Sequence, residues 1–506
     1  MSDDGATAAR AAAWPRRAVA LRLIAAPAAG AAAALGLAPF GIWPATVVGL
    51  AVLAMLWQAA PSPRAAGWTA FLFATGYFAV ALHWIVEPFA VEPELYGWMA
   101  PFALFLMATG LSLFWALAGW AAARARLGLA GLAALLALAE LVRAHLFTGF
   151  PWAMPAHAWI GTAPMQWAAW IGPHGLNLAT LAVALLPAAL WSGGRRVVGA
   201  AALAAGVAVL WAGGLARDMQ AAPDPRSETV RLVQPNAPQQ EKWDPDRIPV
   251  FYARQVGYTM AAPRPDLILW PETALPGLLE RSEQPLAHIA DAAGGAPVVL
   301  GIQRGEAGRF YNSAVLIGPE GEARDVYDKH HLVPFGEYMP FPAFWDRLGI
   351  AGLAVRAEAG YTPGPGPRTL DLGALGRALP LICYEAVFPE DAAGAPERPA
   401  MLLHLTNDAW FGTFSGPYQH LAQARLRAVE QGVPVLRAAN TGVSAVIDAR
   451  GGLGETIPLG EAGYVDAAIP AALPPTLYAR TGGWPAAAAM VVLLGLAAAG
   501  RRAGRR

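Results

Sequence analysis

The sequence predicts an α-helical membrane bundle of eight transmembrane helices that carries an α/β domain outside the bilayer. Two observations indicate this fold class. The chain of 506 residues is 56% hydrophobic and only 14% charged, against about 45–50% and about 25% in ordinary soluble domains. The composition also changes along the chain, because acidic residues are scarce up to about residue 216 and a mixed segment with strand-like stretches follows, from Arg217 to Arg480.

Eight apolar runs approach the length of about 20 residues that a spanning helix needs. Arginines occur in alternate connections between these runs, whereas the loops near 38–42, 87–98 and 147–173 contain no Lys or Arg. Because basic loops stay in the cytoplasm, the pattern predicts cytoplasmic termini and a periplasmic segment 217–480. The runs cover about residues 18–37, 43–59, 66–86, 99–122, 127–146, 174–192, 196–214 and 484–500.

The first run has a second interpretation as a cleavable signal peptide, since "AAPAAGAAAA" offers small residues for cleavage. The run is longer than a usual signal core and further spans follow directly, which favours a retained helix. The predicted organisation is a cytoplasmic tail at 1–17, seven helices within 18–216, a periplasmic domain at 217–480, and the eighth helix with a basic cytoplasmic tail at 481–506.

The periplasmic segment has the pattern of an α/β domain. Continuous apolar stretches such as "LILW" and "MLLHL" indicate sheets that are covered on both faces. Helices are expected near 247–262, 283–293 and 417–431. Strands are expected in "TVRLVQPN", "PDLILWPE", "APVVLGI", the hairpin "SAVLIGPEGEARDVYDK", "LPLICYE", "AMLLHLTND", "VPVLRAANTG" and "SAVIDARGG".

Three residues at or just after the ends of predicted strands form a chemically complete set: Glu272, Lys329 and Cys383. A thiol becomes a strong nucleophile when a base takes its proton, and a carboxylate such as Glu272 can do this. An ammonium such as Lys329 can stabilise both a thiolate and a developing oxyanion. Glu337 and Glu385 add carboxylates that could position the lysine or relay a proton.

Each of these residues also has an ordinary interpretation. An isolated cysteine in an apolar strand is more often a small buried residue, and a Glu or Lys in a loop is more often solvated. His330 and His331 lack metal-ligand spacing, so neither a metal nor another cofactor is expected. One cysteine excludes an intramolecular disulfide. Zero net charge and the lack of a basic stripe argue against a nucleic-acid partner.

The motifs "WPETALP", "YDKHHLVPFGEYMPF", "LICYE" and "LTNDAWFG" together resemble the nitrilase superfamily, whose catalytic residues are Glu, Lys and Cys in this chain order. The eight-helix frame and the wording of "KHHLVPFGEYMP" narrow the resemblance to the apolipoprotein N-acyltransferase family. It covers essentially the whole chain, and it implies a nitrilase-like αββα sandwich as the catalytic domain at 217–480. One departure is Pro235, where some members carry Gly.

The resemblance implies that Glu272 is the general base, that Lys329 stabilises the intermediate and that Cys383 is the acylated nucleophile. It also implies supporting or substrate-contacting roles, with Trp243 in a loop that covers the site. The supporting residues are Trp243, Glu337, Tyr384, Glu385 and Asn407.

The implied activity moves an acyl chain from a phospholipid, the sn-1 chain of phosphatidylethanolamine, through a Cys383 thioester to the N-terminal amine of S-diacylglyceryl-cysteine in lipoproteins. The expected partners are therefore the phospholipid donor, the diacylglyceryl apolipoprotein acceptor and the bilayer. No cofactor is expected. We expect a monomer in the inner membrane of a bacterium. The helices suit such substrates, because exposing an acyl chain to water costs about 0.8 kcal/mol per CH₂.

Two alternatives stay open at this point. A membrane-bound nitrilase-type amidase would hydrolyse small amides and release ammonia. A transporter or receptor would carry intramembrane charges along a path, and the helices offer few such residues beyond Arg22, His83, Glu140 and Arg143. Glu140 and Arg143 lie three residues apart on one helix, so they either pair with each other or help to hold a lipid headgroup.

Overall fold

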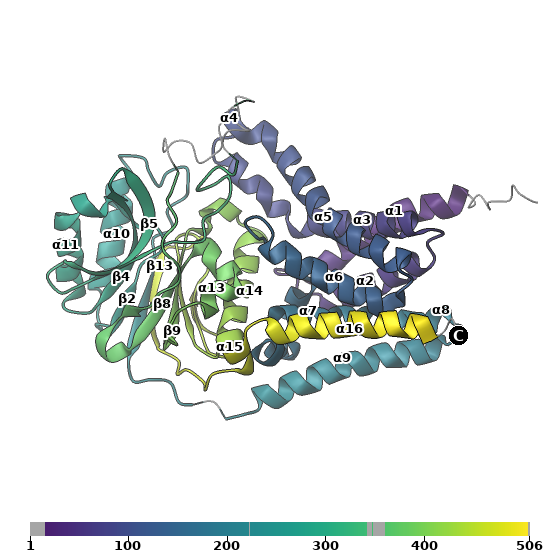
Figure 1. Cartoon of the computed structure of the whole chain (residues 1–506). Coiled ribbons are helices and arrows are strands. Elements are labelled where there is room, and N and C mark those ends of the chain that lie inside the picture. Colours follow the sequence, from purple (N-terminus) through teal and green to yellow (C-terminus); the bar gives the residue numbers. More distant parts are fainter. Residues whose placement is uncertain (1–15, 222, 342–346, 348–359, 504–506) are drawn as a thin grey trace, which may run out of the picture.

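The computed structural model has two parts, a bundle of long helices and a β-rich domain at one end of it (Figure 1). Residues 1–15 of the expected cytoplasmic tail, and Arg505 and Arg506 of the basic end, lie outside the described residues. The residues that the structure describes are 16–221, 223–341, 347 and 360–503.

The bundle contains helices at each of the predicted apolar runs, joined by short helical turns. Its longer helices are α1 (Arg16–Ala34), α2 (Trp43–Gln58), α3 (Pro63–Ala81), α5 (Ala100–Arg124), α6 (Gly128–His145), α7 (Ala168–Leu185), α9 (Arg196–Asp218) and α16 (Trp484–Ala503). Its shorter elements are η1 (His83–Ala90), α4 (Pro93–Tyr96), η2 (Gly97–Met99), η3 (Pro155–Trp159), η4 (Ala163–Trp167) and α8 (Ala188–Ser192).

Two helices differ in shape from the prediction. The third run was expected as one helix over 66–86, but α3 ends at Ala81 and η1 continues at an angle of 45°. The sixth run was expected to begin at residue 174, whereas α7 begins at Ala168 and is kinked at Gly172, which has φ of 67°. Pro173 follows this glycine, and a proline inside a helix removes a backbone donor and forces such a break.

Five helices among the described residues are long and apolar enough to cross a membrane, or six if the bent pair α3 and η1 counts as one span. Arg22–Ala34 and Trp43–Gln58 are apolar but shorter, so the predicted count of eight spans is not confirmed. The five are Pro93–Arg124, Gly128–His145, Ala163–Trp191, Arg196–Asp218 and Trp484–Arg502.

The β-rich domain contains two sheets, with strand orders β13-β1-β2-β4-β5-β6 and β12-β11-β10-β9-β8-β7, and β3 pairs with β4 beside the first. The first sheet consists of β1 (Thr229–Gln234), β2 (Leu267–Leu269), β3 (Leu275–Leu278), β4 (Val298–Glu306), β5 (Arg309–Ile317), β6 (Ala323–Asp328) and β13 (Gly463–Ala468). The second consists of β7 (Leu370–Asp371), β8 (Arg377–Ile382), β9 (Met401–Thr406), β10 (Val435–Ala439), β11 (Ser444–Ile447) and β12 (Leu453–Ile457).

The predicted elements of this domain are confirmed, since each strand-like stretch contains a strand and the three expected helices are present. These helices are α10 (Ile248–Met260), α11 (Glu283–Ala293) and α14 (Gly416–Gln431). The sequence analysis did not anticipate β3, β7, β12 and β13. β3 and β7 are only four and two residues long. β12 is largely exposed and β13 is mostly half-buried, so they lack the apolar runs that reveal buried strands.

Alternating side chains explain the layers. Leu267 and Leu269 of β2 pack in a common core with Leu403 of β9, between the two sheets. Ile268 points the other way and packs with side chains of α10 and α11, while Leu402 packs with side chains of α14. Both faces of each sheet are thus covered, which produces an αββα sandwich with α10 and α11 on its outer side (Figure 1).

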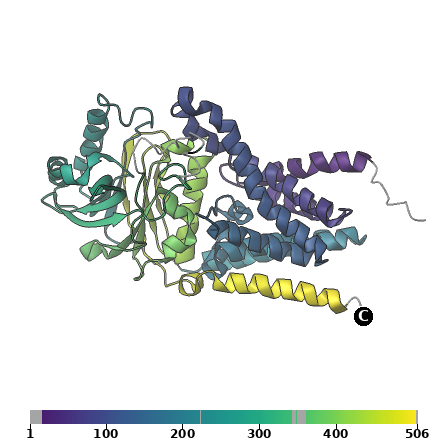
Figure 2. The same ribbon diagram turned by 45° about the horizontal axis from the view of Figure 1, so that its top comes forward.

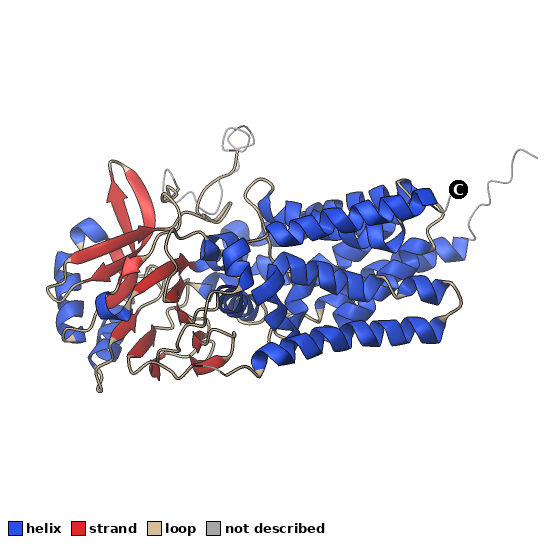
Figure 3. Cartoon of the chain, turned by 60° about the horizontal axis from the view of Figure 1, so that its bottom comes forward, coloured by secondary structure: helices blue, strands red, loops and turns tan. Residues whose placement is uncertain are grey.

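The other helical layer, α14 with α13 (Pro389–Ala393), lies between the second sheet and the bundle (Figure 1). Leu426 and Val429 of α14 pack on Ala168 and Ala169 of α7. Figures 2 and 3 show the same order from other directions, with the sheets at one end and the long helices extending away. The C-terminal end of α16 lies at the end of the bundle remote from the sheets.

A buried ion pair in the bundle fixes the loop that meets the sandwich. Glu140 pairs with Arg143, so the first of the two expected roles for these residues is the one observed. Arg143 also donates to the carbonyls of Phe150 and Trp152, the latter at 2.9 Å. The guanidinium of Arg143 therefore donates its hydrogen bonds to protein groups. The loop held in this way meets the segment that follows β8, since the Gly149 carbonyl accepts from the Tyr384 hydroxyl at 3.3 Å.

Candidate active site

The three predicted catalytic residues lie together at the ends of three strands, and all are buried. Glu272 follows β2, Lys329 directly follows β6, and Cys383 follows β8 and opens the 3₁₀ helix η7 (Cys383–Val387). Strand ends can display reactive groups because the sheet is rigid while the following loops are free to vary. The sandwich therefore assembles a site from segments more than fifty residues apart.

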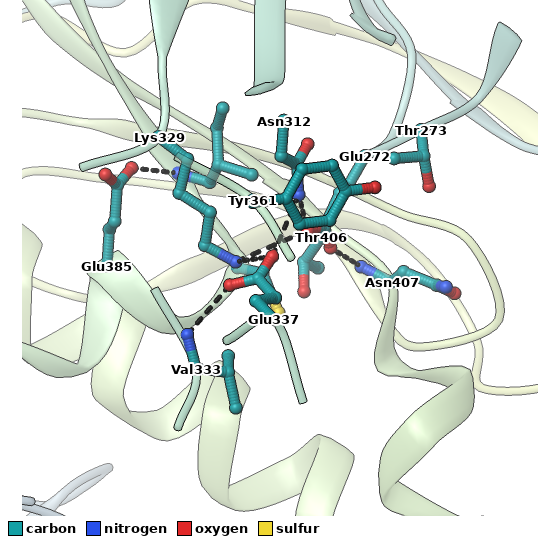
Figure 4. A network of polar contacts seen from close by, with 12 residues as sticks. Glu272, Thr273, Asn312, Lys329, Val333, Glu337, Tyr361, Glu385, Thr406 and Asn407 are labelled. Carbon is teal, nitrogen blue, oxygen red and sulfur yellow. Dashed lines mark hydrogen bonds and ion pairs between the residues drawn. The ribbon is translucent and has the colours of Figure 1, made fainter. Parts of the chain in front are cut away.

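Lys329 lies between two carboxylates. Its Nζ donates to Glu337 Oε1 at 2.8 Å and lies 3.5 Å from Glu272 Oε1, and Figure 4 shows the ammonium and the Glu337 carboxylate pointing toward one another. Burial opposes the charge on Lys329, but Glu337, Glu272 and Cys383 outweigh this effect and raise its pKa above the ordinary value. Lys329 is therefore an ammonium group.

Both oxygens of Glu272 are held in place. Asn312 Nδ2 donates to Glu272 Oε1 at 2.7 Å and to Glu337 Oε1 at 3.2 Å. The backbone N–H of Asn407 donates to Glu272 Oε2 at 2.9 Å (Figure 4). Asn407 is fixed in turn by its side chain, which donates to Gln239 at 2.9 Å. The carboxylate thus has one defined orientation beside the lysine.

Cys383 is a protonated thiol at rest. Burial raises the pKa of Cys383 and the Glu272 carboxylate raises it further, while Lys329 and the Thr406 hydroxyl oppose the rise. Its backbone is strained, because φ is +51°, in the left-handed region that non-glycine residues avoid. The thiol therefore needs a base for reaction, and its turn needs support from neighbours.

Glu385 and Tyr384 are adjacent to the nucleophile in sequence but act on structure. Glu385 Oε2 accepts from the N–H of Ile382 at 2.7 Å, and its Oε1 accepts from the N–H of His330 at 2.8 Å. Tyr384 donates from its hydroxyl to the carbonyl of Gly149 in the bundle loop at 3.3 Å. Together these contacts tie η7 to the lysine segment on one side and to the bundle on the other.

His330 and His331, interpreted from sequence as ordinary residues, reinforce this connection. His330 lies between Glu385 and Asp391, at 2.7 and 3.2 Å. His331 contacts Asp391 at 3.0 Å and donates to the Thr148 carbonyl of the bundle at 3.0 Å. Burial opposes charging of His330, but the two carboxylates outweigh it and raise the pKa of His330 to about 10.

Lys242 is a site residue that the sequence analysis missed. Its Nζ is buried, donates to Thr273 Oγ1 at 2.8 Å and to the Glu272 carbonyl at 3.2 Å, and lies 5.2 Å from the ring centre of Trp243. Burial lowers the pKa of Lys242 to about 8. The scarcity of lysine was the available signal, since both lysines of the chain reach the same site.

Gly301 and Asn312 were also missed, and both act through Glu272. A Cβ added to Gly301 would lie 2.6 Å from the Glu272 Cα and 2.5 Å from the Thr273 nitrogen, so only glycine fits there. Trp243, predicted to cover the site, is 42% exposed. Among the residues that the structure describes, no group of three or more His, Cys, Asp or Glu side chains is arranged to hold a metal ion.

Comparison with known proteins gives two matches of domain families. The family described as apolipoprotein N-acyltransferase N-terminal domain matches residues 29–186, and the carbon-nitrogen hydrolase family matches residues 230–474. A Bradyrhizobium diazoefficiens protein named apolipoprotein N-acyltransferase is 38% identical over 97% of this chain and 96% of its own length. A Caulobacter vibrioides protein of the same name is 39% identical over 94% of each chain. Among solved structures, an amidase from Nesterenkonia sp. is 20% identical and covers 49% of this chain and 92% of its own, with a TM-score of 0.36.

Proposed function

The chain belongs to the apolipoprotein N-acyltransferase family and is an acyltransferase of a bacterial membrane; from this premise we propose how it works. Cys383 takes an acyl chain from a phospholipid, the sn-1 chain of phosphatidylethanolamine, and passes it to the N-terminal amine of S-diacylglyceryl-cysteine in apolipoproteins. The observation that carries this route is a buried ammonium, Lys329, between two carboxylates and beside a protonated thiol.

In the first step Glu272 takes the proton from the Cys383 thiol while the sulfur attacks the ester carbonyl of the phospholipid. Lys329 stabilises the negative oxygen of the tetrahedral intermediate, an effect that acts strongly in a water-excluded site. Collapse breaks the bond between the acyl carbon and the glycerol oxygen. That oxygen takes the proton from Glu272, which leaves a lysophospholipid and a thioester on Cys383.

In the second step the free amine of the lipoprotein attacks the thioester carbon. Glu272 accepts a proton from the amine, and the intermediate collapses to an amide and a Cys383 thiolate, which regains the proton. Donor and acceptor thus use one site in turn, which defines a ping-pong reaction. Glu337 and Asn312 contribute by holding Lys329 and Glu272 in place through both steps.

Exclusion of water decides between transfer and hydrolysis, since water would otherwise cleave the thioester. Burial of Glu272, Lys329 and Cys383 supports such exclusion. Trp243, Phe335 and Phe341 expose large aromatic side chains, the first directly after Lys242 and the other two in the segment that follows Lys329. We assign these loops as the gate, which opens laterally because both substrates arrive in the plane of the membrane.

The membrane arrangement that we propose has eight spans, with the shorter α1 and α2 and the bent pair α3 and η1 included. Seven helices occupy 18–216 and the eighth lies within 481–506. The C-terminal end of α16 lies at the end of the bundle remote from the sandwich (Figure 1), which supports cytoplasmic termini and a periplasmic catalytic domain at 217–480 in the inner membrane. We take the enzyme to be a monomer, since Glu272, Lys329 and Cys383 all come from one chain.

The test is incubation of the full-length protein with phosphatidylethanolamine labelled in the sn-1 chain, followed by mass analysis of the intact protein. An acyl adduct is expected on the wild type and none on Cys383→Ala, and addition of a diacylglyceryl peptide should remove the adduct as N-acylated peptide. An adduct on Cys383→Ala would overturn the route. Ammonia release from small amides without acyl transfer would favour the amidase alternative.

A further inference from the structure

Four ionisable side chains that take no part in the steps above are gathered behind Cys383. They come from β9, the 3₁₀ helix η8 (Asp408–Phe411), α14 and β10, and each is 0% exposed: His404, Asp408, His420 and Arg437. Burying an ion costs several kcal/mol unless it is paired and hydrogen-bonded. A cluster of this kind therefore calls for a physical explanation.

Both histidines of the cluster contact one atom, the carbonyl oxygen of Cys383. His420 Nε2 lies 3.0 Å from it and His404 Nε2 lies 3.2 Å from it. A carbonyl oxygen only accepts hydrogen bonds, so each Nε2 carries the hydrogen. His404 Nδ1 lies 2.8 Å from Arg437 Nη1, which only donates, so this nitrogen is an acceptor and His404 is neutral.

Asp408 holds the other side of the His420 ring. Its Oδ1 lies 2.8 Å from His420 Nδ1, and Arg437 donates to its other oxygen. Burial opposes the charge on Asp408, but Arg437 and His420 outweigh this effect and lower the pKa of Asp408. The Asp408 carboxylate therefore lies between Arg437 and His420 and fixes the orientation of the ring.

The cluster supports the strained turn of the nucleophile. A non-glycine residue in the left-handed region is strained and persists only where the surroundings fix it, and Cys383 has φ of +51°. Two N–H donors on its own carbonyl supply that constraint. Thr406 links the cluster to the side chain of Cys383, because its hydroxyl donates to Asp408 at 2.9 Å and also interacts with the Cys383 thiol.

The His420 ring is itself held by the junction with the bundle. It stacks on Trp152 with ring centres 5.6 Å apart, and Trp152 donates from Nε1 to Gln419 at 2.7 Å. The edge of Phe411 packs against it from another direction. The donor that reaches Cys383 is therefore positioned jointly by the sandwich and the membrane loop.

We propose that His420 is a positioning residue for the nucleophile: supported by Asp408 and Arg437, it holds the Cys383 carbonyl and so keeps Sγ aimed at the acyl carbon. This role rests on the proposed function of Cys383 as the acylated residue. His404 acts as the second donor. Because the role needs only the N–H donor, a substitution that keeps a donor should preserve acylation, which gives the role a signature beyond packing.

The test uses full-length protein and two substitutions that separate the hydrogen bond from packing. His420→Gln keeps an N–H donor, whereas His420→Leu fills the space without one. Gln423→Leu is the matched control, because Gln423 is buried one turn further along α14 and donates to the Gln419 carbonyl. The first measurement is the single-turnover rate of acyl-adduct formation with labelled phosphatidylethanolamine. The second is the KM for phospholipid, which a loss of aim at Sγ should leave unchanged.

We expect His420→Leu to acylate about 100-fold more slowly, the loss typical of a nucleophile displaced by about 1 Å, with an unchanged KM for phospholipid. His420→Gln should recover most of that rate. Gln423→Leu should change neither the rate nor the KM.

An equal loss of rate in His420→Gln and His420→Leu, or the same loss in Gln423→Leu, would overturn the positioning role. If His420→Leu does not fold, His420→Gln decides the question by itself. Its rate should stay within about tenfold of the wild type, and a loss of about 100-fold despite the retained donor would overturn the role. Failure of the underlying function is distinguishable, since it would appear as an acyl adduct on Cys383→Ala.

Discussion

The bundle and the sandwich both bury charged side chains, but they use them differently. In the bundle, Glu140 and Arg143 form one pair, and their remaining hydrogen bonds go to Trp115 and to loop carbonyls. In the sandwich, one ammonium, Lys329, faces two carboxylates, Glu272 and Glu337. In the bundle one carboxylate is paired with one guanidinium and both have their hydrogen bonds, so no group is free to accept a proton. In the sandwich two carboxylates share one ammonium, so a carboxylate is free to accept a proton and chemistry is expected there.

The largest effect should come from replacing Lys329 with a residue of the same charge but a different shape. Lys329→Arg should lower the single-turnover acylation rate about 10³-fold, the scale of losing an oxyanion-stabilising donor. A planar guanidinium does not fit where a compact ammonium lies 2.8 Å from Glu337 and 3.5 Å from Glu272. Arg324→Lys, at an exposed position on β6, is the control. A wild-type acylation rate in Lys329→Arg would show that any positive charge at this position suffices. The distinction drawn between this site and the Glu140–Arg143 pair would then fail.

The next effect tests the Glu140–Arg143 pair in the bundle. Arg143→Met leaves Glu140 buried without its partner, which should cost about 3 kcal/mol of stability. The measurement is the thermal unfolding midpoint in detergent. Glu140→Leu combined with Arg143→Met removes both charges and should be less destabilising than Arg143→Met alone. If the double variant is less stable than Arg143→Met, the charges of Glu140 and Arg143 do not compensate each other.

A smaller effect is expected at Lys242, whose hydrogen bonds to Thr273 and to the Glu272 carbonyl help to hold the proposed base. Lys242→Met removes the donors to Thr273 and to the Glu272 carbonyl, beside a turn in which Thr273 has φ of +43°. The acylation rate should fall about tenfold, the scale of one lost hydrogen bond to a charged group. Arg247→Met removes an exposed basic side chain from the same segment and should leave the rate unchanged. Equal rates in both variants would show that Glu272 needs no such support.

The smallest effect is a pH dependence of stability at the junction of the two parts. His330 has its pKa raised to about 10 by Asp391 and Glu385, so the folded chain holds this proton more tightly than the unfolded chain does. The stabilisation is complete below the unfolded value of about 6.5 and declines as the pH rises toward 10. Urea unfolding of wild type and His330→Gln should therefore differ at pH 6 and converge near pH 10. A difference that grows with pH would contradict this sign.

Several features were predictable because they depend on local sequence. Apolar runs of the right length predicted the helices, and continuous apolar strands predicted sheets covered on both faces. Glu272, Lys329 and Cys383 could be named because each follows a recognisable strand within a motif. The eight-span count is not confirmed, because Arg22–Ala34 and Trp43–Gln58 are shorter than a spanning helix and the bend after Ala81 divides a third apolar run into two helices.

Other site residues could not be predicted, because strand register and packing bring them to the site. Ser313 pairs with Asp328 across β5 and β6, and this register places Asn312 beside Lys329. Ile382 pairs with Leu405 across β8 and β9, which places Thr406 beside Cys383. No local pattern distinguishes Asn312 or Thr406 from other polar residues at strand ends.

The sequence by itself determined the membrane bundle, the α/β domain and the three residues proposed as reactive groups, because hydrophobic length, alternation and side-chain chemistry act locally. Tertiary structure alone decided the environment of those groups. Packing of β8, β9 and α14 brought His404 and His420 onto the Cys383 carbonyl oxygen, and Asp408 and Arg437 adjoin them. Burial then raised the pKa of the Cys383 thiol. Both effects depend on excluding water from side chains distant in the chain, and only the folded molecule does that.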